Sequence, residues 1–167
     1  MQYSTAMARK QPAAQTPLRI GAAAKRETRT QFGALCFRRT GAKKSGVEVL
    51  LVSSRDTGRW IIPKGWPVDG ETPAAAAAME AWEEAGVRGR VYETCIGHYS
   101  YHKWIDEEMS LPCIVAVFAV EVLRLDDDYP EAAERKRKWL TPKKAAQRVE
   151  EEELRHIILS FDPTKLR

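Results

Sequence analysis

Cysteine and long apolar runs are both scarce in this chain of 167 residues. Its three cysteines, Cys36, Cys95 and Cys113, are odd in number and widely spaced. They indicate reduced, mostly buried thiols rather than a disulfide framework. The longest apolar run, from Cys113 to Val122, is too short and too rich in β-branched residues for a membrane span, and it predicts a buried strand. We therefore expect a cytoplasmic protein with no membrane partner.

Acidic residues are nearly absent from the first 29 positions. This stretch holds six cations and one acid, Glu27, and carries +5, whereas residues 30–167 carry −1. We expect residues 1–29 to be a basic, disordered arm and residues 30–167 to be a single domain; an organellar transit peptide is the alternative reading of the arm. Because the positive charge belongs to the arm rather than to a face of the domain, we expect no nucleic-acid partner.

Strand and helix patterns are mixed without a regular βαβ repeat, which predicts an α/β (α+β) fold class. The expected strands are Gln31–Arg38, Val47–Ser54, Trp60–Ile62, Tyr92–Tyr101, Cys113–Leu123 and Arg137–Leu140. The expected helices are Pro73–Ala85, a segment from Pro142 to Val149, and Glu151–Phe161. A hairpin loop is expected at Gly41–Val47 and an exposed turn at Asp126–Pro130.

Three glutamates, Glu80, Glu83 and Glu84, lie within one turn of the first expected helix. A like-charge pair four residues apart costs about 0.2–0.5 kcal/mol, and no lysine or arginine within the helix lies at the right spacing to offset it. One reading is a solvated helix face. The other is a site for hard divalent cations, Mg²⁺ or Mn²⁺, which take oxygen ligands together with phosphate.

Signals at both ends define this helix. Thr72 can cap it, Pro73 suits its first turn, and Gly86 can adopt the left-handed conformation that ends it. A small apolar face is expected to dock on a sheet. That face comprises Ala74, Ala75, Ala78, Trp82 and Ala85.

The spacing around the glutamates resembles the Nudix box, G-x5-E-x7-R-E-U-x-E-E-x-G-U with U apolar. The match starts at Gly65, passes through Glu71 and ends at Gly86 and Val87, and Met79 replaces the arginine. The resemblance implies a Nudix fold, a mixed sheet sandwiched between helices, with Gly65, Glu71 and Gly86 as structural positions.

The resemblance also implies roles for the acidic residues. Glu80, Glu83 and Glu84 would be metal ligands and catalytic residues, with Glu84 or Glu80 taking the proton of a water. The backbone carbonyl of Lys64 or Gly65 would be a further ligand.

Met79 is the one departure from the box. In the family the arginine pairs with the glutamate that corresponds to Glu71 and helps to position the catalytic glutamates. Here either another cation, such as Lys64 or an arginine from a neighbouring loop, replaces it, or the site is looser. A degenerate domain that binds a ligand without turnover is therefore an alternative to an active enzyme.

Three further stretches resemble the diphosphoinositol polyphosphate phosphohydrolases. They are the segment Leu35–Arg39, the segment from Glu48 to Gly65, and the basic segment that starts at Arg135. That subfamily cleaves phosphoanhydride bonds in inositol pyrophosphates and diadenosine polyphosphates, which implies a small-molecule phosphoanhydride substrate. ADP-ribose or a dinucleotide cofactor is the second reading. The chain leaves the oligomeric state open.

A long phosphate chain needs cations besides metals, and arginine matches phosphate oxygens bidentately. The candidates are Arg29, Arg55, Arg59, Lys64, Lys103, Arg135 and Arg137. Alternation places Arg135 and Arg137 on one strand face. Each cation can also be read as an ordinary surface charge. Trp66 or Trp104 could stack on an adenine or belong to the core or rim.

Overall fold

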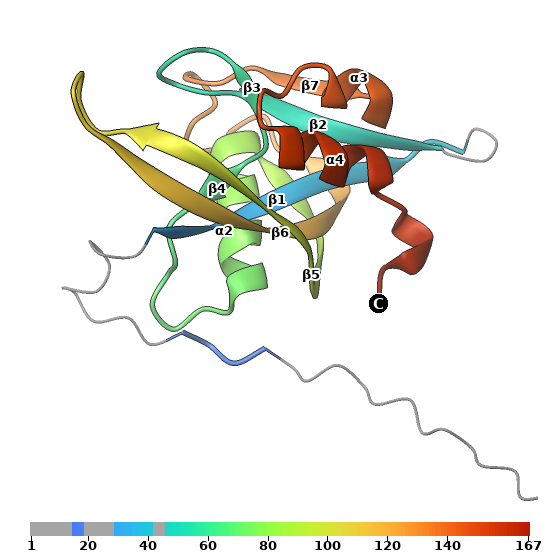
Figure 1. The fold of residues 1–167 in the computed structure, drawn as a ribbon. Helices are drawn as coiled ribbons and strands as arrows, with labels where there is room; N and C mark the ends of the chain where they lie inside the picture. Colours follow the sequence, from blue (N-terminus) through green and yellow to red (C-terminus); the bar gives the residue numbers. More distant parts are fainter. Residues whose placement is uncertain (1–14, 19–28, 42–45) are drawn as a thin grey trace, which may run out of the picture.

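A mixed β-sheet runs through the computed structural model, which describes residues 15–18, 29–41 and 46–167 (Figure 1). Its strands are β1 (Thr30–Arg39), β2 (Val47–Ser53), β3 (Trp60–Ile61), β4 (Lys64–Gly65), β5 (Val87–Trp104), β6 (Ser110–Leu125) and β7 (Arg137–Leu140). The main order is β3-β2-β1-β6-β5, with β4 paired to β1 and β7 paired to β2. Only the β1–β6 pair is parallel among these described strands. The predicted mixed fold class is confirmed.

Strand β1 is buried from Gln31 to Phe37 because helices cover both faces of the sheet. Alternate side chains enter different cores, as the period of two requires. Phe32 and Cys36 pack with helix α2 (Pro73–Ala85), whereas Leu35 and Phe37 pack with α4 (Glu152–Ser160). The short helix α3 (Pro142–Ala146) joins α4 on that second face. The sheet is therefore the middle layer, as the resemblance implied.

Helix α2 has the bounds that its sequence signals predict. Thr72 Oγ1 accepts a hydrogen bond from Ala75 N at 3.1 Å, and Pro73 occupies the first turn. Gly86 ends the helix with φ 66°. A Cβ at this glycine would also lie 2.5 Å from the carbonyl oxygen of Asp126, so both the backbone conformation and the neighbouring turn require glycine.

The face that α2 buries differs from the predicted one. Ala76, Ala77 and Ala81 are buried together with Ala74 and Ala85. The predicted Ala75, Ala78 and Trp82 are only partly covered. The prediction of the face was wrong because five consecutive alanines carry no amphipathic signal. The observed rotation turns Glu84, which is also buried, toward the sheet.

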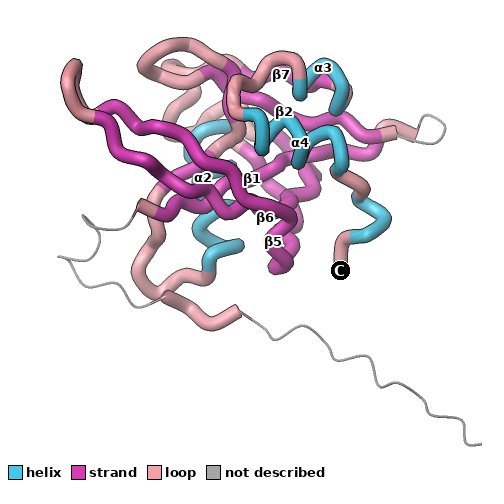
Figure 2. The backbone as a smooth tube through the Cα atoms, viewed as in Figure 1, coloured by secondary structure: helices cyan, strands magenta, loops and turns pink. Residues whose placement is uncertain are grey.

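The hairpin of β5 and β6 is longer than its sequence pattern predicted, and Figure 2 shows the two strands running side by side to the loop that joins them. The expected hairpin between β1 and β2 is confirmed by their antiparallel pairing, although residues 42–45 of its loop lie outside the described residues. Within the described chain, no helix is both long enough and apolar enough to cross a membrane.

Candidate metal and phosphate site

Glu80 lies directly against the backbone of Gly65. Strand β4 pairs with β1 and so brings Lys64 and Gly65 beside α2. A Cβ on Gly65 would overlap both carboxylate oxygens of Glu80. The box glycine is therefore needed for space, because any side chain at Gly65 would displace the carboxylate.

Glu84 is buried in a network that joins α2 to three other segments. Its Oε1 pairs with Arg135 Nη2 at 3.0 Å, and the two side chains are only 7 % and 6 % exposed. Its Oε2 accepts a hydrogen bond from Lys64 N at 3.4 Å. Arg135 also donates to Ser53 O at 3.0 Å and pairs with Glu131. Arg135 was predicted as a phosphate-binding cation. It pairs with Glu84, one of the three box glutamates Glu80, Glu83 and Glu84, here called the acidic cluster.

The surroundings of two box glutamates oppose their negative charge. Burial raises the pKa of Glu80 to about 7, and the nearby Glu83 and Glu131 add to the effect. Burial also raises the pKa of Glu84 to about 7, although Arg135 and Lys64 act in the opposite direction. A carboxyl with a pKa near neutrality is suited to exchange a proton at physiological pH.

The acidic cluster fits a hard divalent cation in the type of its ligands and in charge. Burial raises the pKa of both Glu80 and Glu84, although Arg135 partly offsets the charge of Glu84. The carboxylate of Glu83 makes no hydrogen bond or ion pair within the described residues. No group of three or more His, Cys, Asp or Glu side chains in the described chain is arranged to hold a metal ion. One carboxylate oxygen of Glu84 already pairs with Arg135. The glutamate side chains would therefore need to move to bind an ion, and water or phosphate oxygens would complete its coordination.

Several predicted cations lie around this cluster. Lys64 Nζ lies 4.8 Å from the centroid of the Tyr101 ring, and burial lowers the pKa of its ammonium. Arg55 pairs with Glu131 and Glu134, both at 3.3 Å. Because Glu131 also pairs with Arg135, the two arginines share one acidic partner.

Three other predicted cations have separate surroundings. Lys103 Nζ lies 4.7 Å from the centroid of the Trp66 ring. Arg137 donates to Ala85 O at 2.9 Å and to Asp126 O at 2.7 Å. The Arg29 side chain makes no hydrogen bond or ion pair within the described residues. The structure therefore places Arg137 at the end of α2 rather than on the box carboxylates.

A cavity of about 420 Å³ adjoins Tyr101. It is lined by Thr57, Arg59, Tyr101, His102, Trp104, Glu150 and Glu151. Arg59 pairs with Glu151 Oε1 at 2.6 Å, while the buried Glu151 Oε2 has no hydrogen-bond partner in the described part of the chain. Trp104 is 67 % exposed. Since Lys64 contacts the Tyr101 ring, this cavity, here called the aromatic cavity, lies next to the acidic cluster.

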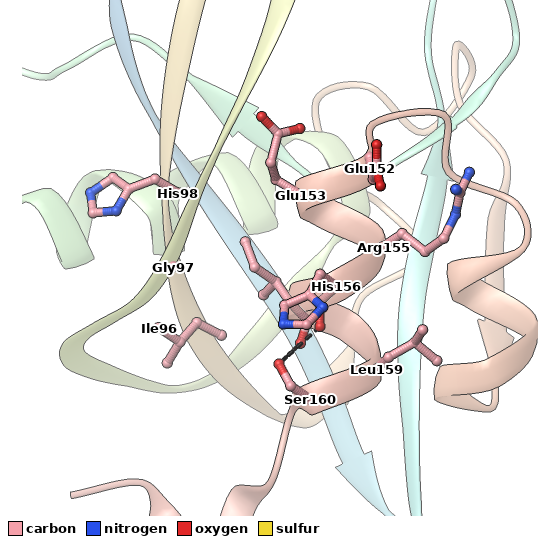
Figure 3. A pocket seen from close by; sticks show the side chains of 10 residues that line it. Ile96, Gly97, His98, Glu152, Glu153, Arg155, His156, Leu159 and Ser160 are labelled. Carbon is pink, nitrogen blue, oxygen red and sulfur yellow. Dashed lines mark hydrogen bonds between the residues drawn. The ribbon is translucent and has the colours of Figure 1, made fainter.

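A larger cavity of about 790 Å³ lies between β5 and α4 (Figure 3). Its walls include Ile96, His98, Glu153 and His156. None of the predicted site residues lines it, so it belongs to a different surface of the domain.

Two residues that shape the site, Glu131 and Glu151, were not predicted from the sequence. Glu131 pairs with two arginines and raises the pKa of Glu80 and Glu84. The spacing of Glu131 and Arg135, four residues apart, was the available signal. Glu151 carried no signal, since it stands in a run of acids from Glu150 to Glu153 that reads as an exposed surface.

The position of the missing box arginine is on the surface. Met79 is 38 % exposed. The carboxylate of Glu71 makes no ion pair or hydrogen bond within the residues that the structure describes. Lys64, one of the expected replacements, contacts Tyr101 instead.

The chain is similar to a known family of domains and to several curated proteins. The model of the NUDIX domain matches residues 27–161. The chain is 38 % identical over 102 residues to "Nudix hydrolase 12, mitochondrial" of Arabidopsis thaliana, a match that covers 59 % of this chain and 50 % of the relative. It is 33 % identical over 130 residues to "Nudix hydrolase 16, mitochondrial" of the same plant, covering 72 % of each.

A mammalian relative and a solved structure extend the comparison. The chain is 35 % identical over 108 residues to "Diphosphoinositol polyphosphate phosphohydrolase 3-alpha" of Mus musculus, covering 63 % of this chain and 59 % of the relative. A crystal structure of C. elegans Ap4A hydrolase shares the fold, with a TM-score of 0.57, 21 % identity, and coverage of 79 % of this chain and 94 % of that chain. The chain thus spans about half to three quarters of the length of these curated relatives.

Proposed function

We propose, because this chain belongs to the NUDIX domain family, that it is a divalent-cation-dependent hydrolase of phosphoanhydride bonds in a polyphosphorylated small molecule. The substrate class is the diadenosine polyphosphate or diphosphoinositol polyphosphate type that relatives and neighbours are named for. Hydrolysis of another nucleoside diphosphate derivative, such as ADP-ribose, is the second candidate. The cytoplasmic location and the organellar alternative for residues 1–29 both stay predictions.

The observation that carries this proposal is the pair of carboxylates, the partly buried Glu80 and the buried Glu84, packed against the Lys64–Gly65 backbone. We assign Glu80, Glu83 and Glu84 as the residues that would hold Mg²⁺ or Mn²⁺, with a backbone carbonyl of Lys64 or Gly65. Such an ion, when bound, offsets phosphate charge and lowers the pKa of a water molecule.

The chain's own groups supply the remaining steps. Glu84 or Glu80 accepts the proton of the attacking water, a role that a pKa near 7 suits. Lys64, Arg55 and Arg135 are the nearby cations that would orient phosphate oxygens. Arg135 has a second role as the fixed counter-charge of Glu84.

The aromatic cavity favours a nucleoside end on the substrate over a further cluster of phosphates. Glu150 and Glu151 outnumber Arg59, the one lysine or arginine among the described residues that line the cavity, which pairs with both. The wall therefore keeps a net negative charge, which disfavours phosphate. The unpaired oxygen of Glu151 would accept a hydrogen bond from an amino or hydroxyl group, and the exposed Trp104 offers a stacking surface. Within the proposed substrate class, these features of the aromatic cavity favour a diadenosine polyphosphate over an inositol pyrophosphate.

The first test is a panel of phosphoanhydrides assayed with Mg²⁺ and with Mn²⁺, with products identified by mass. Glu83→Gln should lower kcat by about a hundredfold or more while the protein keeps its melting temperature, since the Glu83 side chain has no partner to lose in the described chain. Glu107→Gln, in the exposed loop between β5 and β6, removes the same charge and should leave the rate unchanged. Wild-type rates in Glu83→Gln would refute the assignment.

A second test separates an active enzyme from a degenerate domain. Met79→Arg restores the residue that the box otherwise has at this exposed position. An active enzyme should change its rate only modestly. A rise of the hydrolysis rate from near zero would indicate that the natural chain is a degenerate domain that binds a ligand without turnover.

A third test addresses the nucleoside end. Trp104→Ala should raise KM for a diadenosine polyphosphate by about tenfold, since stacking on a base contributes about 1–3 kcal/mol. Ile105→Ala truncates a neighbouring exposed side chain and serves as the matched control. An equal rise of KM for an inositol pyrophosphate would contradict the assignment of the cavity to a nucleoside.

A further inference from the structure

Four residues of the N-terminal segment, Gln15–Leu18, lie against the loop that leads from β4 into α2 (Figure 1). Leu18 N donates to Glu71 O at 2.8 Å, and Gly70 N donates to Leu18 O at 2.7 Å. The Leu18 side chain packs, together with Val68, against the core that α2 closes. The loop therefore gains two backbone hydrogen bonds and an apolar contact from outside the box.

Gln15 satisfies a donor at the start of α2. The first backbone N–H groups of a helix have no partner within it. Here Thr72 caps Ala75 N, Pro73 has no N–H, and Gln15 Oε1 accepts from Ala74 N at 3.1 Å. The Gln15 amide also donates to the Glu93 carbonyl of β5. One side chain thus links the segment to the helix and to the sheet.

The segment binds the backbone of Glu71, whose carboxylate makes no hydrogen bond or ion pair within the described residues. The resemblance to the box implies an arginine at position 79 that pairs with Glu71, and Met79 cannot form such an ion pair. Glu71 is held through its backbone by Leu18 instead. The loop has other contacts, such as Lys103 on the Trp66 ring and the Glu71 N to Val68 O hydrogen bond. The bonds from Gln15–Leu18 add to these contacts, and a loop that loses such contacts opens at lower free energy.

We propose that Gln15–Leu18, here called the clasp, is a positioning element of the acidic site. It fixes residues 66–72 and the start of α2, and through them the approach of the Gly65 backbone to Glu80. It replaces the function of the missing box arginine. The effect on catalysis rests on the proposed function, whereas the effect on the loop does not.

Hydrogen exchange and calorimetry test the clasp without relying on turnover. Leu18→Pro removes the N–H that Glu71 accepts and keeps an apolar side chain; Gln15→Ala removes the bond to Ala74. Protection of the Gly70 and Ala74 amides should fall about tenfold or more, and Mg²⁺ affinity should fall several-fold. Thr16→Ala, at an exposed position of the same segment, is the control. Unchanged protection in both variants would overturn the proposal.

A rescue experiment tests the replacement of the arginine. Adding Met79→Arg to Leu18→Pro should restore Mg²⁺ affinity and the protection of the Gly70 amide, because the new guanidinium can pair with Glu71. Failure to restore either quantity would overturn the claim that clasp and arginine share one function. The two proposals can fail separately. If the phosphoanhydride panel shows no hydrolysis while hydrogen exchange of the loop changes as expected, the proposed function is wrong and the role of the clasp is supported.

Discussion

Glu80 is a carboxyl whose surroundings favour its protonated form. Burial raises its pKa from the ordinary value of 4.5 to about 7. Between about pH 4.5 and pH 7 the Glu80 carboxyl holds a proton in the folded protein but has lost it in the unfolded chain. The free energy of unfolding must therefore decrease as pH rises through this window.

We expect the melting temperature of the metal-free protein to fall between about pH 5 and pH 7.5. Glu80→Gln should remove part of this fall, and Glu84, whose pKa is raised in the same direction, accounts for more of it. Calorimetric scans in EDTA at several pH values measure the effect, with Glu107→Gln as the matched control. A profile of Glu80→Gln parallel to that of the natural chain would contradict the raised pKa.

Gly65 is the residue on which the position of Glu80 depends. In Gly65→Ala the new methyl group would overlap the Glu80 carboxylate, which is the end of a flexible side chain and can rotate away. We expect a small loss of stability and a drop of kcat/KM by about a hundredfold, because a misplaced ligand weakens metal-assisted catalysis. Gly58→Ala offers a contrast, since nothing lies within 4 Å of its Cβ although its φ is 69°. It should lose some stability but keep its activity.

At the scale of elements, Arg137 closes the C-terminal end of α2. Its guanidinium donates to the carbonyls of Ala85 and Asp126 and lies 4.8 Å from the centroid of the Tyr129 ring. Arg137→Ala should lower the free energy of unfolding by about 1–3 kcal/mol and leave KM nearly unchanged. Urea denaturation and steady-state kinetics measure the two effects, and Lys138→Ala on the same strand is the control. If Arg137→Ala instead raised KM and left the free energy of unfolding unchanged, Arg137 would have to be assigned to phosphate binding.

The elements themselves were largely predictable because local chemistry specifies them. Thr72, Pro73 and Gly86 define α2, and the short continuous apolar runs of β1 and β2 are typical of strands that are buried on both faces. The two-residue strand β4 was not expected because two residues carry no period. The rotation of α2 was mispredicted for a similar reason, since its alanine run is apolar on every side.

The box spacing predicted the acidic cluster, but not how its charges are compensated. Arg135, which was expected to bind phosphate near the cleft, forms an ion pair with Glu84. Arg137, two residues later, lies on the end of α2. The contact of Glu131 with Arg55 and the contacts of Leu18 with Gly70 and Glu71 join segments that are distant in sequence, and no local pattern predicts them.

At the scale of the whole molecule, the acidic cluster exists only when α2, β4 and the segment carrying Arg135 are assembled. These segments are held together by the sheet, with one core beneath α2 and another beneath α4. An unfolded chain offers the same carboxylates without the arrangement. A cation that needs the arrangement therefore binds the folded state and stabilises it.

We expect saturating Mg²⁺ to raise the melting temperature of the whole chain. At a concentration of about one hundred times Kd, the gain is about 2.7 kcal/mol, which for a domain of this size corresponds to about 5–10 °C. Thermal scans at pH 7.5 should show this rise, its reversal by EDTA and its loss in Glu83→Gln. The rise should be smaller near pH 5, since Glu80 and Glu84, with pKa values of about 7, then hold protons that the cation must displace. A rise of equal size in Glu83→Gln would show that the cation binds elsewhere on the molecule.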